Sequence, residues 1–90
     1  MALLASDDFE GQECVRVYIA GRLEEAKRVE QALTDAGIDY FVEIERFERR
    51  LLGVVRREYE GAAFYVPLDR SAATRLLLRN ARLTSGLEET

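Results

Sequence analysis

The feature that most constrains the fold of this chain is the stretch of residues 14–20, in which apolar and polar side chains alternate. The apolar residues on one side of the extended backbone are Val15, Val17 and Ile19. Arg16 and Tyr18 lie on the other side, which is the period-two pattern of a half-buried strand. Gly21 ends this pattern and a helical pattern begins at once, so the sequence predicts a strand that leads directly into a helix.

Residues 22–36 carry apolar side chains at spacings of three and four, which predicts one buried face of a helix about four turns long. The apolar positions are Leu23, Ala26, Val29, Leu33 and Ala36. Glu24 and Glu25 fall in the first turn, where the helix dipole favours acidic residues. Gly37 is expected to end the helix in the left-handed conformation.

Two more strands and a second helix are predicted downstream. Residues 38–45 alternate again, and their core side holds Ile38, Tyr40, Val42 and Ile44. Residues 61–66 form a strand that starts near residue 57 and is closed by Pro67, which has no N–H to donate. Asp69 is expected to cap a helix that runs to about residue 82. Its periodic positions are Ala72, Ala73, Leu76, Leu77, Asn80, Ala81 and Leu83.

This order predicts an α+β domain of the ferredoxin-like βαββαβ type, an antiparallel sheet with two helices on one face. In that topology the strands at residues 14–20 and 61–66 lie side by side in the centre of the sheet. The fourth strand is expected to be weak or absent, since Leu83 and Leu87 are its only signal.

The predicted domain covers residues 14–83. Residues 1–13 are expected to be a flexible acidic tail, with an arm docked through Leu3, Leu4 and Phe9 as the alternative. Residues 84–90 are expected to be a second flexible tail. A single domain of this size buries a limited core, so a homodimer is also expected.

The amino-acid composition limits the kinds of functional site that this chain can form. Histidine is absent and Cys14 is the single cysteine, which argues against structural zinc sites, histidine-activated nucleophiles and an intramolecular disulfide. We therefore predict no enzyme and no catalytic residue, cofactor or metal site. Cys14 is interpreted as a small buried apolar residue, and the location is expected to be cytoplasmic because no leader or membrane-spanning run is recognised.

Residues 46–57 are the first candidate site, because five arginines against one glutamate give them a charge of +4. The whole chain carries -4, so the remainder sums to -8. The arginines are Arg46, Arg49, Arg50, Arg56 and Arg57. On a connection between two strands, their guanidinium groups could bind a small anionic ligand or an acidic protein partner. The alternatives are an extended hairpin or packing helix with solvated arginines, or contact with a membrane surface.

The sheet face away from the helices is the second candidate. Arg16 and Tyr18 are expected there beside Phe41 and one of Phe64 and Tyr65. Exposed aromatic side chains gathered on a sheet are typical of a contact surface, so dimerisation or partner docking is favoured.

An RNA-binding function is the alternative for the same face. Residues 17–23 and 60–66 resemble the two short motifs of an RNA recognition motif, in which Tyr18 and Phe64 would stack on bases. The second motif departs from the pattern at Glu60, Ala62 and Pro67. Because the chain is also acidic, nucleic acid is not the favoured partner.

Glu43 and Glu45 are the third candidate, since two carboxylates on one side of a strand could share a metal ion or a proton. The favoured interpretation of this pair is a solvated strand face.

Several segments resemble the prokaryotic signal-transducing proteins, a family of small bacterial domains of unknown function related in fold to the PII nitrogen regulators. The similar segments are residues 17–20, 25–26, 33–38, 41–42, 64–67, 72–73 and 76–77. The resemblance implies a ferredoxin-like domain with a regulatory role, no known chemistry, and a partner-binding connection at residues 46–57. No PII nucleotide-binding motif is recognised, so neither ATP nor 2-oxoglutarate is implied.

Overall fold

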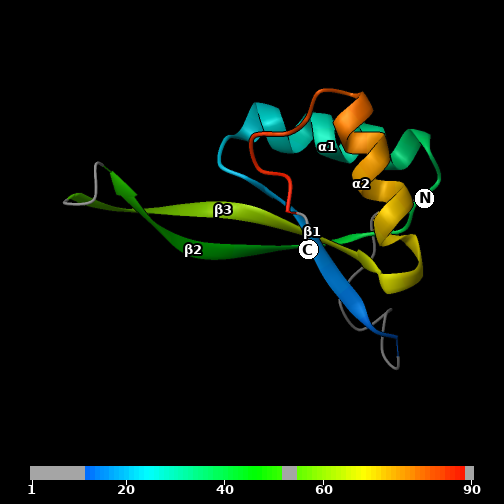
Figure 1. The fold of residues 1–90 in the computed structure, drawn as a ribbon, viewed down its shortest axis with the longest axis horizontal. Coiled ribbons are helices and arrows are strands. Elements are labelled where there is room, and N and C mark those ends of the chain that lie inside the picture. The colour runs from blue at the N-terminus through cyan, green and yellow to red at the C-terminus, as the bar shows by residue number, and fades with distance from the viewer. Residues whose placement is uncertain (1–11, 52–54, 89–90) are drawn as a thin grey trace.

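The computed structural model describes residues 12–51 and 55–88, with side chains described at residues 12–46 and 60–88 (Figure 1). Within these residues the chain forms three strands, two α-helices and a short 3-10 helix. The elements are β1 (Cys14–Ala20), α1 (Leu23–Asp35), β2 (Phe41–Leu51), β3 (Val55–Pro67), η2 (Leu68–Arg70) and α2 (Ser71–Asn80). No helix in the described part of the chain is long and apolar enough to cross a membrane.

The three strands form one antiparallel sheet in the order β1-β3-β2, and both helices lie on the same side of it (Figure 1). The predicted α+β class is therefore confirmed, and so is the pairing of the first strand with the third. Tyr18 lies opposite Phe64 in that pairing. This arrangement is compatible with a ferredoxin-like fold.

The C-terminal segment lies along the outer edge of β1, where the fourth strand was expected to be weak or absent. Tyr18 and Leu87 form an isolated antiparallel bridge. The Ile19 N–H donates to the Gly86 carbonyl at 2.9 Å, and the Glu88 N–H donates to the Val17 carbonyl at 2.8 Å. Residues 84–88, predicted as part of a flexible tail, are thus tied to the sheet by one bridge rather than by a full strand.

Residues 46–57 continue both neighbouring strands instead of forming a loop or a helix. β2 runs to Leu51 rather than to residue 45, and β3 begins at Val55, where Leu51 and Val55 are paired. The hairpin alternative is confirmed and the helix alternative is wrong. The connection is reduced to residues 52–54, which lie outside the described residues.

A β-bulge in β1 overturns the predicted placement of Tyr18. The register with β3 shifts between Arg16 and Tyr18, so Val17 is an extra residue on the β1 side. One extra residue moves every later side chain to the other face of a strand. Tyr18 is therefore fully buried under the helices, whereas the sequence pattern placed it on the open face.

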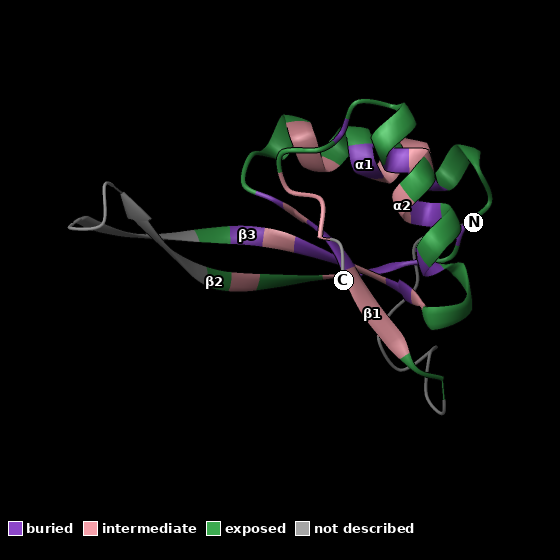
Figure 2. Ribbon diagram, viewed as in Figure 1, coloured by how far each residue is buried: buried purple, intermediate pink, exposed green. Residues whose placement is uncertain are grey.

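The core lies between the sheet and the two helices (Figure 2). Its buried members are Val17, Tyr18, Ala20, Val29, Leu33, Ile38, Tyr40, Phe64, Val66, Leu78 and Leu83. The large apolar residues Leu23 (72%), Ile44 (68%) and Leu76 (54%), which were predicted for the core, are instead exposed, and so is the smaller Ala36. Cys14 is half-buried rather than buried.

The exposure of Leu76 follows from how α2 is rotated against the sheet. Its buried side chains are Ser71, Thr74 and Leu78, a stripe that includes two hydroxyl groups. Each hydroxyl donates to a backbone carbonyl within the helical region, Ser71 to Leu68 and Thr74 to Arg70, both at 2.7 Å. Burial of these polar groups is therefore compensated, which hydropathy alone does not reveal.

Asp69 does not cap α2. It lies within η2, and the N-terminus of α2 has no side-chain capping hydrogen bond. The 3-10 turn leads directly into the helix instead.

Both helices end in the same backbone motif, in which one residue adopts the left-handed conformation. In α1 this residue is Gly37, with φ of 70°, and the Ile38 N–H donates to the Leu33 carbonyl at 3.0 Å. In α2 it is Arg82, with φ of 63°, and the Leu83 N–H donates to Leu78 at 2.9 Å. The Gly37 cap predicted from sequence is confirmed.

Arg82 carries a conformational cost that glycine would avoid. We expect Arg82→Gly to raise the free energy of unfolding by about 0.5–1 kcal/mol, because glycine adopts positive φ without a Cβ penalty. Gly37→Ala should lower it by about 1 kcal/mol although the added methyl would meet open space. Urea denaturation of both variants measures these two opposite changes in the free energy of unfolding. A destabilised Arg82→Gly variant would contradict the positive φ of Arg82.

Candidate functional site

The structure brings the five predicted arginines onto the β2–β3 hairpin. Arg46 lies opposite Glu60 in the ladder, Arg49 opposite Arg57, and Arg50 opposite Arg56. Arg46 is exposed. The side chains of the other four arginines lie outside the described residues, so their assignment rests on sequence and register.

Beyond the core, this hairpin consists of two strands only. β1 ends at Ala20, which lies opposite Ala62, so the part of β3 before Ala62 pairs with β2 alone among the described residues. Figure 1 shows the two strands extending well past the helices. The basic residues 46–57 thus lie on a part of the sheet that the helices do not cover.

The sheet face away from the helices carries an aromatic pair that joins β2 to β3. Phe41 lies opposite Tyr65, and their rings stack with centroids 4.9 Å apart and an interplanar angle of 3°. The structure therefore places Tyr65 on this face and Phe64 in the core. Phe41 is only 9% exposed, so the prediction that it is an exposed aromatic side chain on this face is wrong.

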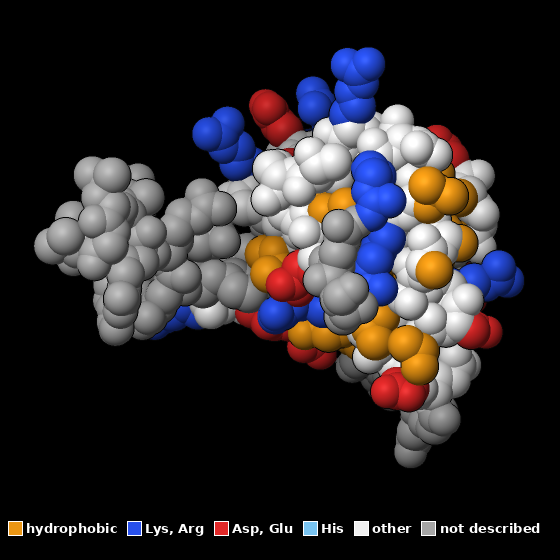
Figure 3. Space-filling view, viewed as in Figure 1, with side chains coloured by type: hydrophobic (Ala, Val, Ile, Leu, Met, Phe, Trp, Pro, Cys, Tyr) orange, Lys and Arg blue, Asp and Glu red, His pale blue; other side chains and the backbone are white. Residues whose placement is uncertain are grey.

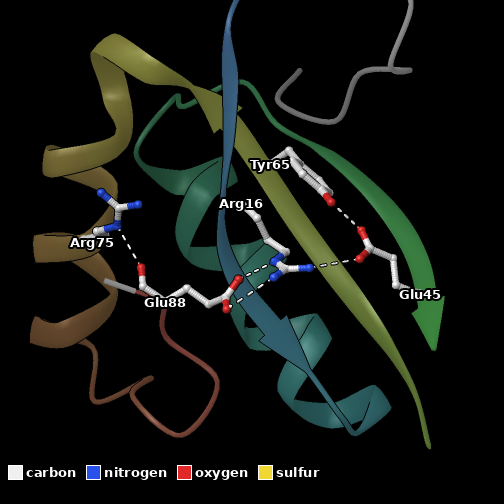
Figure 4. A network of polar contacts seen from close by, with 5 residues as sticks. All are labelled: Arg16, Glu45, Tyr65, Arg75 and Glu88. Atoms are coloured by element: carbon white, nitrogen blue, oxygen red, sulfur yellow. Dashed lines mark hydrogen bonds and ion pairs between the residues drawn. The ribbon is translucent and has the colours of Figure 1, made fainter. Parts of the chain in front are cut away.

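Arg16 is the centre of a polar cluster on the same face, and it lies between two carboxylates (Figure 4). Its Nη1 pairs with Glu45 Oε1 at 3.0 Å. Its Nε donates to the carboxylate of Glu88. Two negative charges therefore face this guanidinium group, and any anion that binds Arg16 must compete with them.

Two further contacts extend this cluster. The Tyr65 hydroxyl donates to Glu45, and Arg75 Nε on α2 donates to the main-chain carbonyl of Glu88 at 2.8 Å (Figure 4). The cluster thus links all three strands, α2 and the C-terminal segment. Because its members are partly exposed, each ion pair is expected to contribute about 1 kcal/mol or less.

The cluster accounts for one member of the predicted carboxylate pair. Glu45 is engaged by Arg16 and Tyr65, whereas Glu43 is exposed opposite Ala63. In the described part of the chain, no group of three or more acidic or cysteine side chains is placed to hold a metal ion. The structure therefore provides a solvated strand face for Glu43 and an ion-paired position for Glu45.

Burial raises the pKa of Tyr65 to about 12, and the negative charge of Glu45, which accepts its hydrogen bond, adds to the shift. Burial likewise raises the pKa of Tyr40 to about 12, with a smaller contribution from Glu30. Both phenols are therefore neutral at physiological pH, and Tyr65 acts as a donor. Arg16 is held in its charged form, because the hydrogen bond to Glu88 raises the pKa of its guanidinium group.

These tyrosines make the stability of the domain sensitive to alkaline pH. The unfolded chain loses its phenolic protons near pH 10, whereas the folded chain keeps those of Tyr40 and Tyr65 until about pH 12. We expect the stabilisation that depends on these two neutral phenols to be fully present below pH 10 and to be lost progressively as pH rises from 10 to 12. The absorbance of the phenolate forms gives the titration midpoints of Tyr40 and Tyr65. Urea denaturation at each pH gives the loss in the free energy of unfolding. A Tyr65→Phe variant should remove one high midpoint, and titration of all tyrosines near pH 10 would contradict the prediction.

The two residues on which RNA stacking depended are in the core. Tyr18 is 0% exposed and Phe64 is 1% exposed. The Tyr18 hydroxyl makes no hydrogen bond of ordinary geometry, and burial raises its pKa. Neither ring is available to a base without opening the domain.

Exposed apolar side chains are scattered in the described part of the chain. The large ones are Leu23, Ile44, Leu68 and Leu76. On the face drawn in Figure 3 the apolar groups are small and separated by charged side chains. Within the described residues, the distinctive features are therefore the hairpin and the Arg16 cluster, not an apolar patch.

The Arg16 cluster was missed by the sequence reasoning. Arg16 and Glu88 are 72 residues apart, and Glu88 falls in a segment that reads as a tail. No local pattern indicates such a pair.

Comparison with known proteins finds no family model, no curated protein and no solved structure that matches this chain.

Proposed function

We propose that this chain is a small non-enzymatic regulatory domain whose β2–β3 hairpin binds an acidic protein partner, with a small anionic ligand as the related alternative. The observation that carries the proposal is the concentration of positive charge in one segment of the sequence, together with the position of that segment in the fold. Residues 46–57 carry +4 against -8 for the rest, and they occupy a ribbon that extends past the helices (Figure 1). A cationic arm of this kind is suited to bidentate contacts with carboxylates.

A ferredoxin-like fold is part of the proposal. It is supported by the element order, the β1–β3 pairing, the two helices on one face, and the bridge between Tyr18 and Leu87 at the position of a fourth strand. Membership of the prokaryotic signal-transducing proteins and a cytoplasmic location remain proposals that rest on the sequence resemblance and on the lone cysteine. A partner-binding arm between the second and third strands agrees with that resemblance.

RNA binding remains the alternative function, and the structure favours it less than the sequence does. Tyr18 and Phe64 are buried, and Phe41 is only 9% exposed. Stacking of bases on a sheet needs exposed rings.

The experiment is an NMR titration of the ¹⁵N-labelled full chain with three probes, namely poly-glutamate, inorganic phosphate and a single-stranded oligouridylate. Poly-glutamate should shift amide signals of residues 46–57 and leave those of the core unchanged. Phosphate acting on the same amides would favour the small anion. Oligouridylate binding tightly, with a steep dependence on salt, would favour RNA instead.

Matched variants separate the hairpin from general charge. Arg49→Ser/Arg50→Ser/Arg57→Ser should abolish poly-glutamate binding and leave the melting temperature within a few degrees. The control Arg22→Ser/Arg28→Ser/Arg70→Ser removes the same charge from three exposed positions elsewhere. Equal loss of binding in both variants, or a loss of folding with the first, would overturn the proposal.

A further inference from the structure

The outer edge of β2 is the longest edge of the sheet that the described chain leaves without a neighbour. β3 lies between β1 and β2 from Ala62 onwards and is open on one side only before it, and β1 has its outer edge bridged by the C-terminal segment through Gly86 and Glu88. β2 lies at the other end of the order β1-β3-β2. Its outward backbone N–H and C=O groups can therefore pair with another strand.

β2 is long and regular for an edge strand, although six of its 11 residues are charged and charged side chains are one of the features that protect an edge. It has 11 residues, against about 5–6 for an average strand, and it contains no proline, glycine or lysine. Its register with β3 is uninterrupted from Phe41 to Leu51, so no bulge twists it away. An isolated two-stranded ribbon is also only marginally stable in water, and the hairpin beyond Ala62 is such a ribbon. A third strand along β2 would stabilise it.

We infer that the third strand is β2 of a second copy of this chain, paired antiparallel across a two-fold axis with Phe47 of each copy at the axis. A two-fold axis perpendicular to a sheet leaves each face of the sheet on its original side. Two residues that lie opposite each other in the two copies must therefore have their side chains on the same face. This is possible only if one residue of β2 lies opposite the same residue of the partner subunit. If that residue is charged, two like charges meet. Glu45, Arg46 and Glu48 are thereby disfavoured as the axis residue.

Charge complementarity along β2 selects the register. With Ile44 at the axis, Glu43 would lie opposite Glu45 of the partner subunit, which is unfavourable. With Phe47 at the axis, Arg46 lies opposite Glu48 of the partner subunit and Glu45 lies opposite Arg49 of the partner subunit. Symmetry repeats each pair, and no like charges lie directly opposite. The exposed Ile44 then falls inside the interface.

This arrangement joins two three-stranded sheets into one continuous sheet. Leu51 of one copy lies opposite Glu43 of the partner subunit in this register, so each projecting ribbon is supported by the body of its partner. The inference uses the edge of β2 and the order of its charges, including Arg46 and Arg49 as contacts to the partner subunit, and it does not require an acidic protein or a small anion to bind the hairpin.

The first test is the oligomeric state of the full chain by sedimentation velocity over a wide concentration range. A concentration-dependent dimer is expected. Arg46→Glu and Glu48→Arg should each weaken it, raising Kd roughly tenfold, because each places like charges opposite one another twice. The double variant Arg46→Glu/Glu48→Arg reverses both members of the pair and should restore the dimer. Melting temperatures of all three report whether the monomer is intact.

The second test is disulfide trapping in a Cys14→Ser background. Phe47→Cys should form a covalent dimer under mild oxidation, because the two copies of residue 47 lie opposite each other. Ile44→Cys is the matched control, since its two copies would be about 20 Å apart in this register. A chain that stays monomeric at every concentration, a double variant that is not restored, or equal trapping of both cysteines would overturn the inference.

Discussion

Replacing Gly86 with alanine is expected to lower the free energy of unfolding by about 2–3 kcal/mol. A Cβ atom at Gly86 would lie 1.9 Å from the Ile19 carbonyl oxygen and 2.9 Å from a ring carbon of Tyr18. The first neighbour is a backbone atom near the C-terminal end of β1 and cannot rotate away. The C-terminal segment must therefore move off β1, which breaks the hydrogen bonds between Ile19 and Gly86 and between Val17 and Glu88.

Urea denaturation of Gly86→Ala measures the loss in the free energy of unfolding, and amide hydrogen exchange shows which backbone hydrogen bonds are broken. The N–H groups of Ile19 and Glu88 should lose protection in Gly86→Ala, whereas those of α1 should be less affected. Gly37→Ala is the control, because its added methyl meets open space and only the positive φ is strained. If Gly86→Ala were as stable as the parent chain, the close approach of this segment to β1 would be wrong.

Phe64→Ala should have the largest effect of any substitution discussed here, with a loss of about 3–5 kcal/mol in the free energy of unfolding. Phe64 is 1% exposed, lies opposite both Tyr18 and Val42 in the sheet, and contacts the Tyr40 ring at a centroid distance of 5.7 Å. Its removal leaves a cavity at the centre of a small core. Since a domain of this size has a total stability of roughly 5–10 kcal/mol, much of the folding free energy would be lost.

The neighbouring residue supplies the control for Phe64→Ala. Tyr65→Phe removes a half-buried hydroxyl that donates to Glu45 on the opposite face, and it should cost about 1 kcal/mol. Thermal or urea denaturation of the two variants compares the faces of β3 directly. Equal losses would contradict the assignment of Phe64 to the core and Tyr65 to the open face.

The local elements could be predicted because their signals are short in range. The alternation at residues 14–20 and the spacing of Val29 and Leu33 predict β1 and α1 to within a residue or two. Gly37 marks the end of α1 because few other residues adopt positive φ at low cost. These features depend on neighbours along the chain, which the sequence displays directly.

The sequence could not show whether residues 46–57 form a hairpin or a loop, because the pattern of their side chains does not distinguish the two. Beyond residue 45 the chain carries charged and apolar residues without a strict period, since a ribbon outside the core need not bury one face. The excess of arginine in residues 46–57 could be recognised from the sequence, but the position of these arginines on two paired strands could not. The boundary of β2 therefore moved from residue 45 to Leu51.

By itself, the sequence determined the class of the domain, the order of its elements and the segregation of positive charge into residues 46–57. Only the tertiary structure decided that Tyr18 is buried, that Ser71 and Thr74 face the core, and that Arg16 meets Glu88. Periodicity and helix ends are set by a few adjacent residues. A bulge, the rotation of a helix and a contact over 72 residues are set by packing between elements, which no local pattern records.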